Sequence, residues 1–181
     1  SSSVKYGNGL FTDPDNRPIT SAPEMALRAS GGVFVYFGTG KLIEPQDRLP
    51  GSEKMESLYA VIDRESALDD PDLGEPELNN VGAGEREIIG ASGRDGWVLD
   101  LGSEASPTGE RALAKPRVVL GTVLFTTFEP EDDPCSPGGI QRLYLLDAFD
   151  GGGDLPPTED CQNCGMVPIG SGAPIVPPLV I

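Results

Sequence analysis

The sequence predicts an all-β fold, and three observations lead to that prediction. Apolar residues gather into short runs of strand length that are rich in Val, Leu, Tyr and Phe. Gly and Pro, with 24 and 18 residues in a chain of 181, separate these runs. Helix-forming sequence is scarce, since the best stretch, residues 66–73, is interrupted by Pro71. We therefore expect many short strands joined by turn-rich loops.

The strands are expected in a definite order along the chain. They fall at residues 33–37, 57–63, 96–101, 117–120, 122–128 and 142–147, with a last pair at 175–176 and 179–181. The fourth and fifth of these runs should fold back on each other about Gly121. Two long loops, residues 63–94 and 147–172, are acidic or rich in Gly and Pro, and solvated insertions are their favoured interpretation.

Composition and charge exclude several classes of function. The chain carries 29 acidic and 13 basic residues, a net charge of −16, and has no His. Without His it has no Ser-His-Asp or Cys-His catalytic machinery. The negative charge argues against binding to nucleic acid or to an anionic membrane surface. No run approaches the ~18 apolar residues of a membrane span. The start at Ser1 indicates a chain that begins after a signal peptide or inside a longer polypeptide.

An internal repeat adds architecture to the fold class. A Pro-led strand, a Gly-led apolar strand and a strand beginning Leu-Tyr and ending in Asp occur in that order in residues 22–63 and again in 115–147. This pattern is typical of blades, which must stack to bury both faces. We expect a partial β-propeller of about two blades and the start of a third. Residues 1–181 would form one domain fragment, with repeats at 18–101, 112–150 and 173–181.

Two local expectations follow from the blade interpretation. The Asp that ends the Leu-Tyr strand should accept hydrogen bonds from the backbone of the following turn. Trp97, which opens the strand at 96–101, should pack between neighbouring blades rather than serve as a ligand platform. Gly38-Thr39-Gly40-Lys41 lacks the spacing of a phosphate loop and is interpreted as a strand-ending turn.

Acidic residues raise the question of calcium. Asp147, Asp150 and Asp154 surround a run of three glycines and are candidate calcium ligands, but their spacing does not match an EF-hand loop. A plain turn is the favoured interpretation of that segment. Asp13 and Asp15 lie in a sequence typical of an ordinary β-turn with Pro at its second position. No other metal ligands can be assigned, and no catalytic or cofactor-binding residue is expected.

The three cysteines predict a disulfide in an exported protein. Cys161 and Cys164 form a C-x-x-C motif, but Gly165 and Pro168 follow it and do not favour the helix that a redox motif needs. A zinc site would need a second pair of ligands. The bridge joins Cys161 to Cys164, or Cys135 to one of these two, and the sequence does not distinguish these pairings.

A set of short motifs in order resembles one family. They include residues 35–41 with their Gly-Thr-Gly-Lys end, 58–63, 96–101, Gly109-Glu110-Arg111, 123–130, Cys135, Gly138-Gly139 and 143–147. Over most of residues 10–181 this order is similar to the C-terminal β-propeller of type IV pilus tip-associated adhesins, the PilC/PilY family. Each motif alone carries little information, whereas their order along the chain is fairly specific.

The resemblance implies a function and a location. The chain would be a non-enzymatic, quinoprotein-like propeller segment of an exported protein at the pilus tip, on the cell surface or in the outer membrane. It would support pilus biogenesis and attachment to host or abiotic surfaces. Its partners would be other parts of the propeller, subunits that cover open blade edges, and pilus proteins. Two alternatives are a quinoprotein-type dehydrogenase, which needs a quinone and calcium, and a structural subunit of a larger exported assembly.

Overall fold

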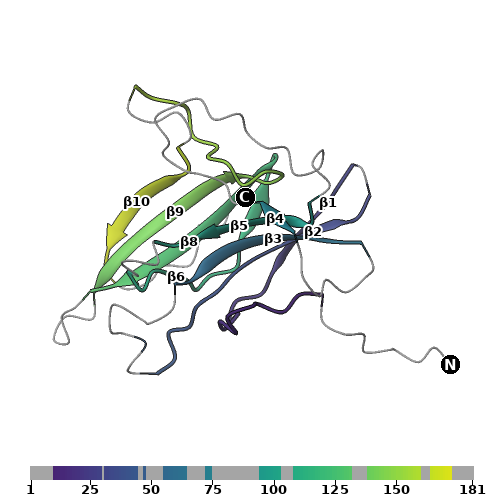
Figure 1. Cartoon of the computed structure of the whole chain (residues 1–181). Helices are drawn as coiled ribbons and strands as arrows, with labels where there is room; N and C mark the ends of the chain where they lie inside the picture. The colour runs from purple at the N-terminus through teal and green to yellow at the C-terminus, as the bar shows by residue number, and fades with distance from the viewer. Residues whose placement is uncertain are drawn as a thin grey trace.

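The computed structural model describes residues 10–29, 31–44, 47, 55–64, 72–74, 94–102, 108–131, 138–159 and 164–172. In this part of the chain the regular structure is all β, arranged as two antiparallel sheets that lie against each other (Figure 1). The prediction of an all-β fold is confirmed. No helix long and apolar enough to cross a membrane occurs among these residues.

Sheet 1 comes from the first half of the chain. Its strands are β1 (Glu24–Leu27), β2 (Val33–Gly38), β3 (Ser57–Asp63), β4 (Leu73–Gly74) and β5 (Gly96–Asp100). The order across the sheet is β1-β2-β3-β5-β4, and all neighbours are antiparallel except β4, which runs parallel to β5. Four strands thus form a meander, and β4, from the acidic segment, lies on its outer edge.

Sheet 2 comes from the second half. Its strands are β6 (Arg111–Ala112), β7 (Arg117–Val119), β8 (Thr122–Pro130), β9 (Gly139–Asp147) and β10 (Met166–Ser171). Strands β6 and β7 both pair with β8, at opposite ends, and β9 and β10 follow on the other side of β8. Sheet 2 is therefore the same four-stranded meander as sheet 1, with its first strand divided into β6 and β7.

The hairpin expected about Gly121 is present and tight. Leu120 and Gly121 have φ values of 51° and 92°, and they join the paired residues Val119 and Thr122. Two successive residues with positive φ are the geometry of a type I′ turn, whose twist suits a two-residue hairpin. Strands β7 and β8 consequently pair up to their last residues.

The structure adds three strands that the sequence did not predict, β4, β6 and β10, and β4 lies within the segment 63–94 that was expected to be a loop. Strand β6 is only two residues long, and β10 contains Pro168 and Gly170, which are typical of loops. Strand β10 pairs with β9 through a register shift between Pro168 and Gly170, as an edge strand can. Sheet 2 therefore extends beyond the expected repeat of residues 112–150. The third repeat, at 173–181, lies outside the described residues.

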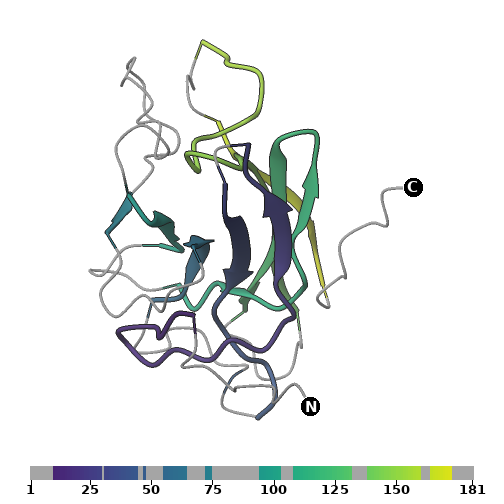
Figure 2. The same cartoon turned by 90° about the vertical axis from the view of Figure 1, so that its right-hand side faces the viewer.

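The main core fills the space between the two sheets, and Figure 2 shows the β1–β2 hairpin beside the β7–β8 hairpin. Trp97 is completely buried there, with its ring edge-on to Phe125 of sheet 2 at a centroid distance of 6.2 Å. Its indole Nε1 and the Tyr36 hydroxyl both donate to the carbonyl oxygen of Ala148, at 3.4 and 3.0 Å. The expectation that Trp97 packs between neighbouring sheets is confirmed.

A smaller core lies on the other face of sheet 1. Phe37, Tyr59 and Val61 are buried there, and Leu10 and Phe11 of the N-terminal segment pack over them. The Phe11 ring lies 5.4 Å from the Phe37 ring and 5.1 Å from the Tyr59 ring. Both faces of sheet 1 are therefore apolar, as expected of an inner sheet in a stack rather than of a sheet with one face in water.

Candidate functional site

The two sheets meet at a seam built from two of the short sequence motifs. Gly38 ends β2, Gly40 lies two residues beyond that end, and Arg111 and Ala112 form β6. A Cβ atom on Gly38 would lie 2.2 Å from the Cβ of Ala112, and one on Gly40 would lie 2.4 Å from the Cβ of Arg111. The backbone N–H of Ala112 donates to the Thr39 carbonyl at 3.0 Å. The Gly-Thr-Gly end of β2 thus gives β6 the room to join sheet 2 to sheet 1.

Arg111 faces sheet 1 from this seam. Its Nε donates to the Gly109 carbonyl and its Nη1 to the Lys41 carbonyl, both at 2.8 Å. Its Nη2 is buried without a hydrogen-bond partner, and so is Oε2 of Glu56. Burial lowers the pKa of Arg111, against the attraction of Glu56 and Asp47, and burial raises the pKa of the Glu56 carboxyl. Arg111 and Glu56 thus place opposite charges in the buried part of the seam, where each acts on the pKa of the other.

Glu110, the neighbour of Arg111, faces sheet 2. Its Oε1 accepts hydrogen bonds from the Tyr144 hydroxyl at 3.0 Å and from the Thr127 hydroxyl, and its Oε2 accepts from Arg142 Nη1 at 3.0 Å. Arg142 also forms an ion pair with Glu129 at 2.6 Å. Burial raises the pKa of Glu110 despite these donors. Two adjacent charged residues thus bind β6 to both sheets.

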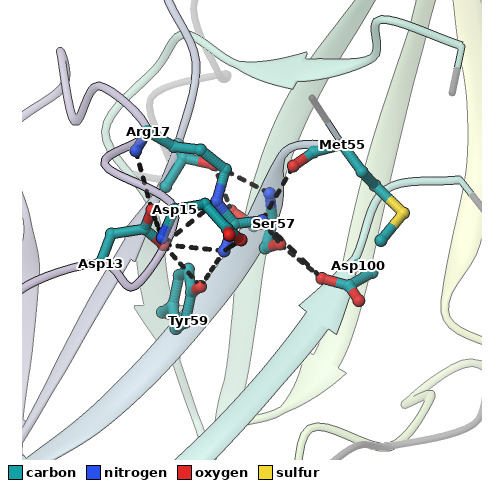
Figure 3. A network of polar contacts seen from close by, with 8 residues as sticks. Asp13, Asp15, Arg17, Met55, Ser57, Tyr59 and Asp100 are labelled. Atoms are coloured by element: carbon teal, nitrogen blue, oxygen red, sulfur yellow. Dashed lines mark hydrogen bonds and ion pairs between the residues drawn. The ribbon is translucent and has the colours of Figure 1, made fainter. Parts of the chain in front are cut away.

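A second buried network holds the N-terminal segment onto sheet 1 (Figure 3). Arg17 Nη2 forms an ion pair with Asp13 Oδ1 at 2.7 Å, and Arg17 Nη1 donates to the Met55 carbonyl at 2.8 Å. The Tyr59 hydroxyl donates to Asp13 Oδ1 at 2.8 Å. Burial acts to raise the pKa of Asp13, but hydrogen bonds from Arg17 and Tyr59 outweigh it and lower the pKa.

The predicted turn at residues 13–16 is present, since the backbone N–H of Asn16 donates to the Asp13 carbonyl at 3.0 Å. Interpreting it as an ordinary turn missed the role of its first side chain. Asp13 is buried and accepts the backbone N–H of Arg17 at 2.8 Å as well as its guanidinium. Sequence spacing alone does not reveal this, because the network also needs Tyr59, 46 residues away.

The two networks occupy equivalent places in the repeat. Tyr59 pairs across the sheet with Phe37, and Tyr144 pairs in the same way with Phe125. Each tyrosine directly follows a leucine in its strand, and each donates to a carboxylate in the segment that enters its sheet. We define the front face of a sheet as the one that carries this tyrosine and the back face as the opposite one.

This definition shows how the sheets stack. Tyr144, on the front face of sheet 2, belongs to the core between the sheets, whereas Tyr59 lies on the far side of sheet 1. The shared core on the sheet 1 side consists of back-face residues such as Leu58 and Ala60. Sheet 1 thus presents its back to the front of sheet 2. A rotation that repeats around an axis produces this front-to-back packing, which is the geometry of successive blades.

The candidate calcium ligands make turn contacts. Asp147 Oδ1 accepts the backbone N–H groups of Phe149 and Asp150 at 2.8 and 3.2 Å, which confirms the expected role of the Asp at the strand end. Asp150 Oδ1 accepts the N–H of Gly152 at 2.8 Å, and Asp154 accepts the Thr122 hydroxyl. Within the described part of the chain, no three His, Cys, Asp or Glu side chains form a metal-binding group. Calcium binding here stays a prediction.

The disulfide prediction has a partial answer. Cys164 is disulfide-bonded and directly precedes the segment that leads into β10. Cys135 and Cys161 lie outside the described residues, so the choice between the pairings stays open. The backbone carbonyl of Cys164 also accepts the N–H of Leu155 at 2.9 Å.

Comparison with known proteins assigns the family. A "Type IV pilus biogenesis factor PilY1 homolog" from Xylella fastidiosa is 31% identical over an alignment of 160 positions, gaps included, that covers 77% of this chain. The chain belongs to the PilY1 family of type IV pilus biogenesis factors. PilY1 of Pseudomonas aeruginosa is 27% identical over an alignment of 193 positions, gaps included, that covers 89% of this chain. No family model matches the chain.

A solved structure supports the fold. The crystal structure of the Pseudomonas aeruginosa PilY1 C-terminal domain, a β-propeller, matches 91% of this chain with a TM-score of 0.69 and 17% sequence identity. The chain covers 42% of that structure, and it covers 10% and 17% of the lengths of the two PilY1 relatives. These PilY1 relatives are named as biogenesis factors, not as enzymes. Membership of the family predicted from the motifs and a β-propeller-like fold are therefore both confirmed.

Proposed function

We propose that this PilY1-family chain is a non-enzymatic scaffold segment of an exported protein that acts at the type IV pilus tip in pilus assembly and surface attachment. The observation that carries the proposal is the 31% identity over 77% of the chain to a type IV pilus biogenesis factor. Pilus proteins and surfaces outside the cell would be its partners, and its excess of acidic side chains favours contacts with basic surfaces.

The buried polar residues support a scaffold role. Glu110 is held by Tyr144, Thr127 and Arg142, and Asp13 is held by Arg17 and Tyr59. Both carboxylates are shielded from solvent and fixed by neighbours on β-strands or turns. Groups held in this way position one segment against another, whereas a catalytic acid or base must reach a substrate. The networks therefore join segments to sheets.

The test is deletion of the gene in its natural host, with complementation by the intact gene. We expect the deletion strain to lose most of the pilin that can be sheared from its surface and to attach poorly to surfaces. The intact gene should restore both properties. Normal surface pilin in the deletion strain would overturn the proposal. A bound quinone absorbance in the purified protein would contradict its non-enzymatic part.

A further inference from the structure

The turn between β7 and β8 carries an apolar side chain in a backbone conformation that does not suit it. Leu120 is fully exposed, and its φ is 51°. In this left-handed region the Cβ of a leucine lies too close to the backbone carbonyl oxygen. Asn16 is the one other non-glycine residue with positive φ in the described part of the chain, and asparagine tolerates that conformation. Leu120 therefore lowers stability through strain and also exposes apolar surface to water.

The repeat does not require a leucine at this turn. The corresponding turn of sheet 1, between β1 and β2, has Gly31 and Gly32 at positive φ values of 90° and 84°. The two central positions of a type I′ turn are suited best by Asn-Gly, which adopts them with little strain. The fold alone thus gives no reason for a leucine at position 120. Strained residues that persist in a structure are typical of functional sites.

The turn is held in place by the segment that follows β9, and Figure 2 shows the two at the same end of the sheets. The Gly121 carbonyl accepts the backbone N–H of Ala148 at 2.8 Å. The next residue, Thr122, donates its hydroxyl to Asp154. Leu120 is therefore presented on an ordered support. An anchor that is ordered before binding loses little conformational entropy when it binds.

The surroundings of the turn are apolar and acidic. Phe149, one residue beyond the contact with Gly121, is 48% exposed, and its ring is fixed edge-on to the Phe34 ring at 6.0 Å. The guanidinium of Arg28 lies over the same Phe34 ring at 5.3 Å. Three acidic residues belong to the segment that holds the turn: Asp147, Asp150 and Asp154. A surface complementary to this one has an apolar pocket with a basic rim.

We propose that the β7–β8 tip, Leu120 with Phe149 near it, inserts into an apolar pocket with a basic rim on a pilus protein. The proposal rests on the proposed function, which supplies the pilus protein, and it adds the surface that binds that protein. Insertion removes the Leu120 side chain from water, so a residue that is unfavourable in the free chain becomes favourable in the complex.

Leu120→Asn in the full-length protein, made in its natural host, tests the role of the tip. Because Asn-Gly suits a type I′ turn, the level of the protein and its resistance to protease should equal or exceed those of the parent. The strain should nevertheless lose most of the pilin that can be sheared from its surface, as the deletion strain does. Ile43→Asn is the matched control, because Ile43 is 76% exposed and lies outside the strands. That variant should keep the surface pilin of the parent.

A photo-crosslinker near the tip identifies the partner. With p-benzoylphenylalanine in place of Phe149, which has a similar shape, irradiation of piliated cells should join the protein to a pilus subunit that mass spectrometry can name. The same crosslinker in place of Ile43 should not form this product. Leu120→Asn should lower the yield of the product at position 149 at least about tenfold, the effect of losing one anchor residue.

Other outcomes overturn the proposal. Normal surface pilin in the Leu120→Asn strain would mean that the tip binds no pilus protein. Loss of pilin together with loss of the protein itself would mean that Leu120 serves the fold. Crosslinks only within the same polypeptide, or none at all, would exclude a pilus subunit as the occupant. Each of these results would leave the role in pilus biogenesis untouched, because surface pilin in the deletion strain tests that role separately.

Discussion

Asp13 and Glu110 are buried carboxylates with the same structural role, but their pKa values are shifted in opposite directions. Asp13 receives the Arg17 guanidinium on both oxygens, and these hydrogen bonds overcome the cost of burial, so its pKa is lowered. Glu110 receives Arg142 on one oxygen only, and Arg142 is shared with Glu129. Burial therefore dominates at Glu110 and raises its pKa. The difference arises from the balance between burial and the hydrogen-bond donors that reach each carboxylate.

This difference predicts opposite pH dependence for two variants. The lowered pKa of Asp13 contributes stability that is present above its ordinary value of 3.8 and is lost as the pH falls through the lowered pKa. The raised pKa of Glu110 contributes stability that is present below 4.5 and is lost as the pH rises through the raised pKa. Urea unfolding across the acid range should show Asp13→Asn losing its deficit at the lowest pH, and Glu110→Gln gaining on the parent toward neutral pH.

The two variants control for each other, because each removes one buried carboxylate from an equivalent network. If the free energies of unfolding of both variants followed that of the parent in parallel at every pH, the buried networks would not be present as described. The same sign of change in both would mean that one carboxylate is in a different environment.

Among the strands, the seam between the two sheets depends on a glycine, Gly38, at the end of β2. Gly38 has no positive φ that requires glycine, so its role is steric. Gly38→Ala would place a methyl group 2.2 Å from the Ala112 Cβ, and we expect a loss of about 1–3 kcal/mol in the free energy of unfolding. Gly170→Ala is the matched control, because that glycine also lies in a strand and its Cβ would meet nothing within 4 Å. Equal effects of the two changes in denaturant unfolding would refute the seam.

The elements also show what the sequence could predict. Strands β2, β3, β5, β7, β8 and β9 were recognisable because each contains a run of β-branched, aromatic or other apolar residues. Strand β6 was not, because it is two residues long and its pairing depends on β8 and Thr39, which are distant in sequence. The Gly-Thr-Gly and Gly-Glu-Arg motifs were noticed from the sequence, but only the structure shows that they touch.

For the molecule as a whole, the sequence repeat shows how the two sheets stack once the two faces of each sheet are told apart. The sequence predicted two similar units but could not say how they stack. The registers of Tyr59 and Tyr144 show a front-to-back arrangement, which a ring of blades can continue and a two-sheet sandwich packed on equivalent faces could not. The outer faces of both sheets remain apolar, with Met25 and Leu27 on one and Leu143 and Leu145, partly exposed, on the other.

The two sheets form one unit around a shared core, and the single tryptophan of the chain reports on that core directly. Trp97 is buried between Tyr36 and Phe125, so its emission should be that of an indole in an apolar environment. During urea unfolding of the 181-residue chain, Trp97 emission and far-UV circular dichroism should change in one coincident transition. Native emission typical of water-exposed indole, or an emission change at lower urea than the loss of strand signal, would contradict the shared core.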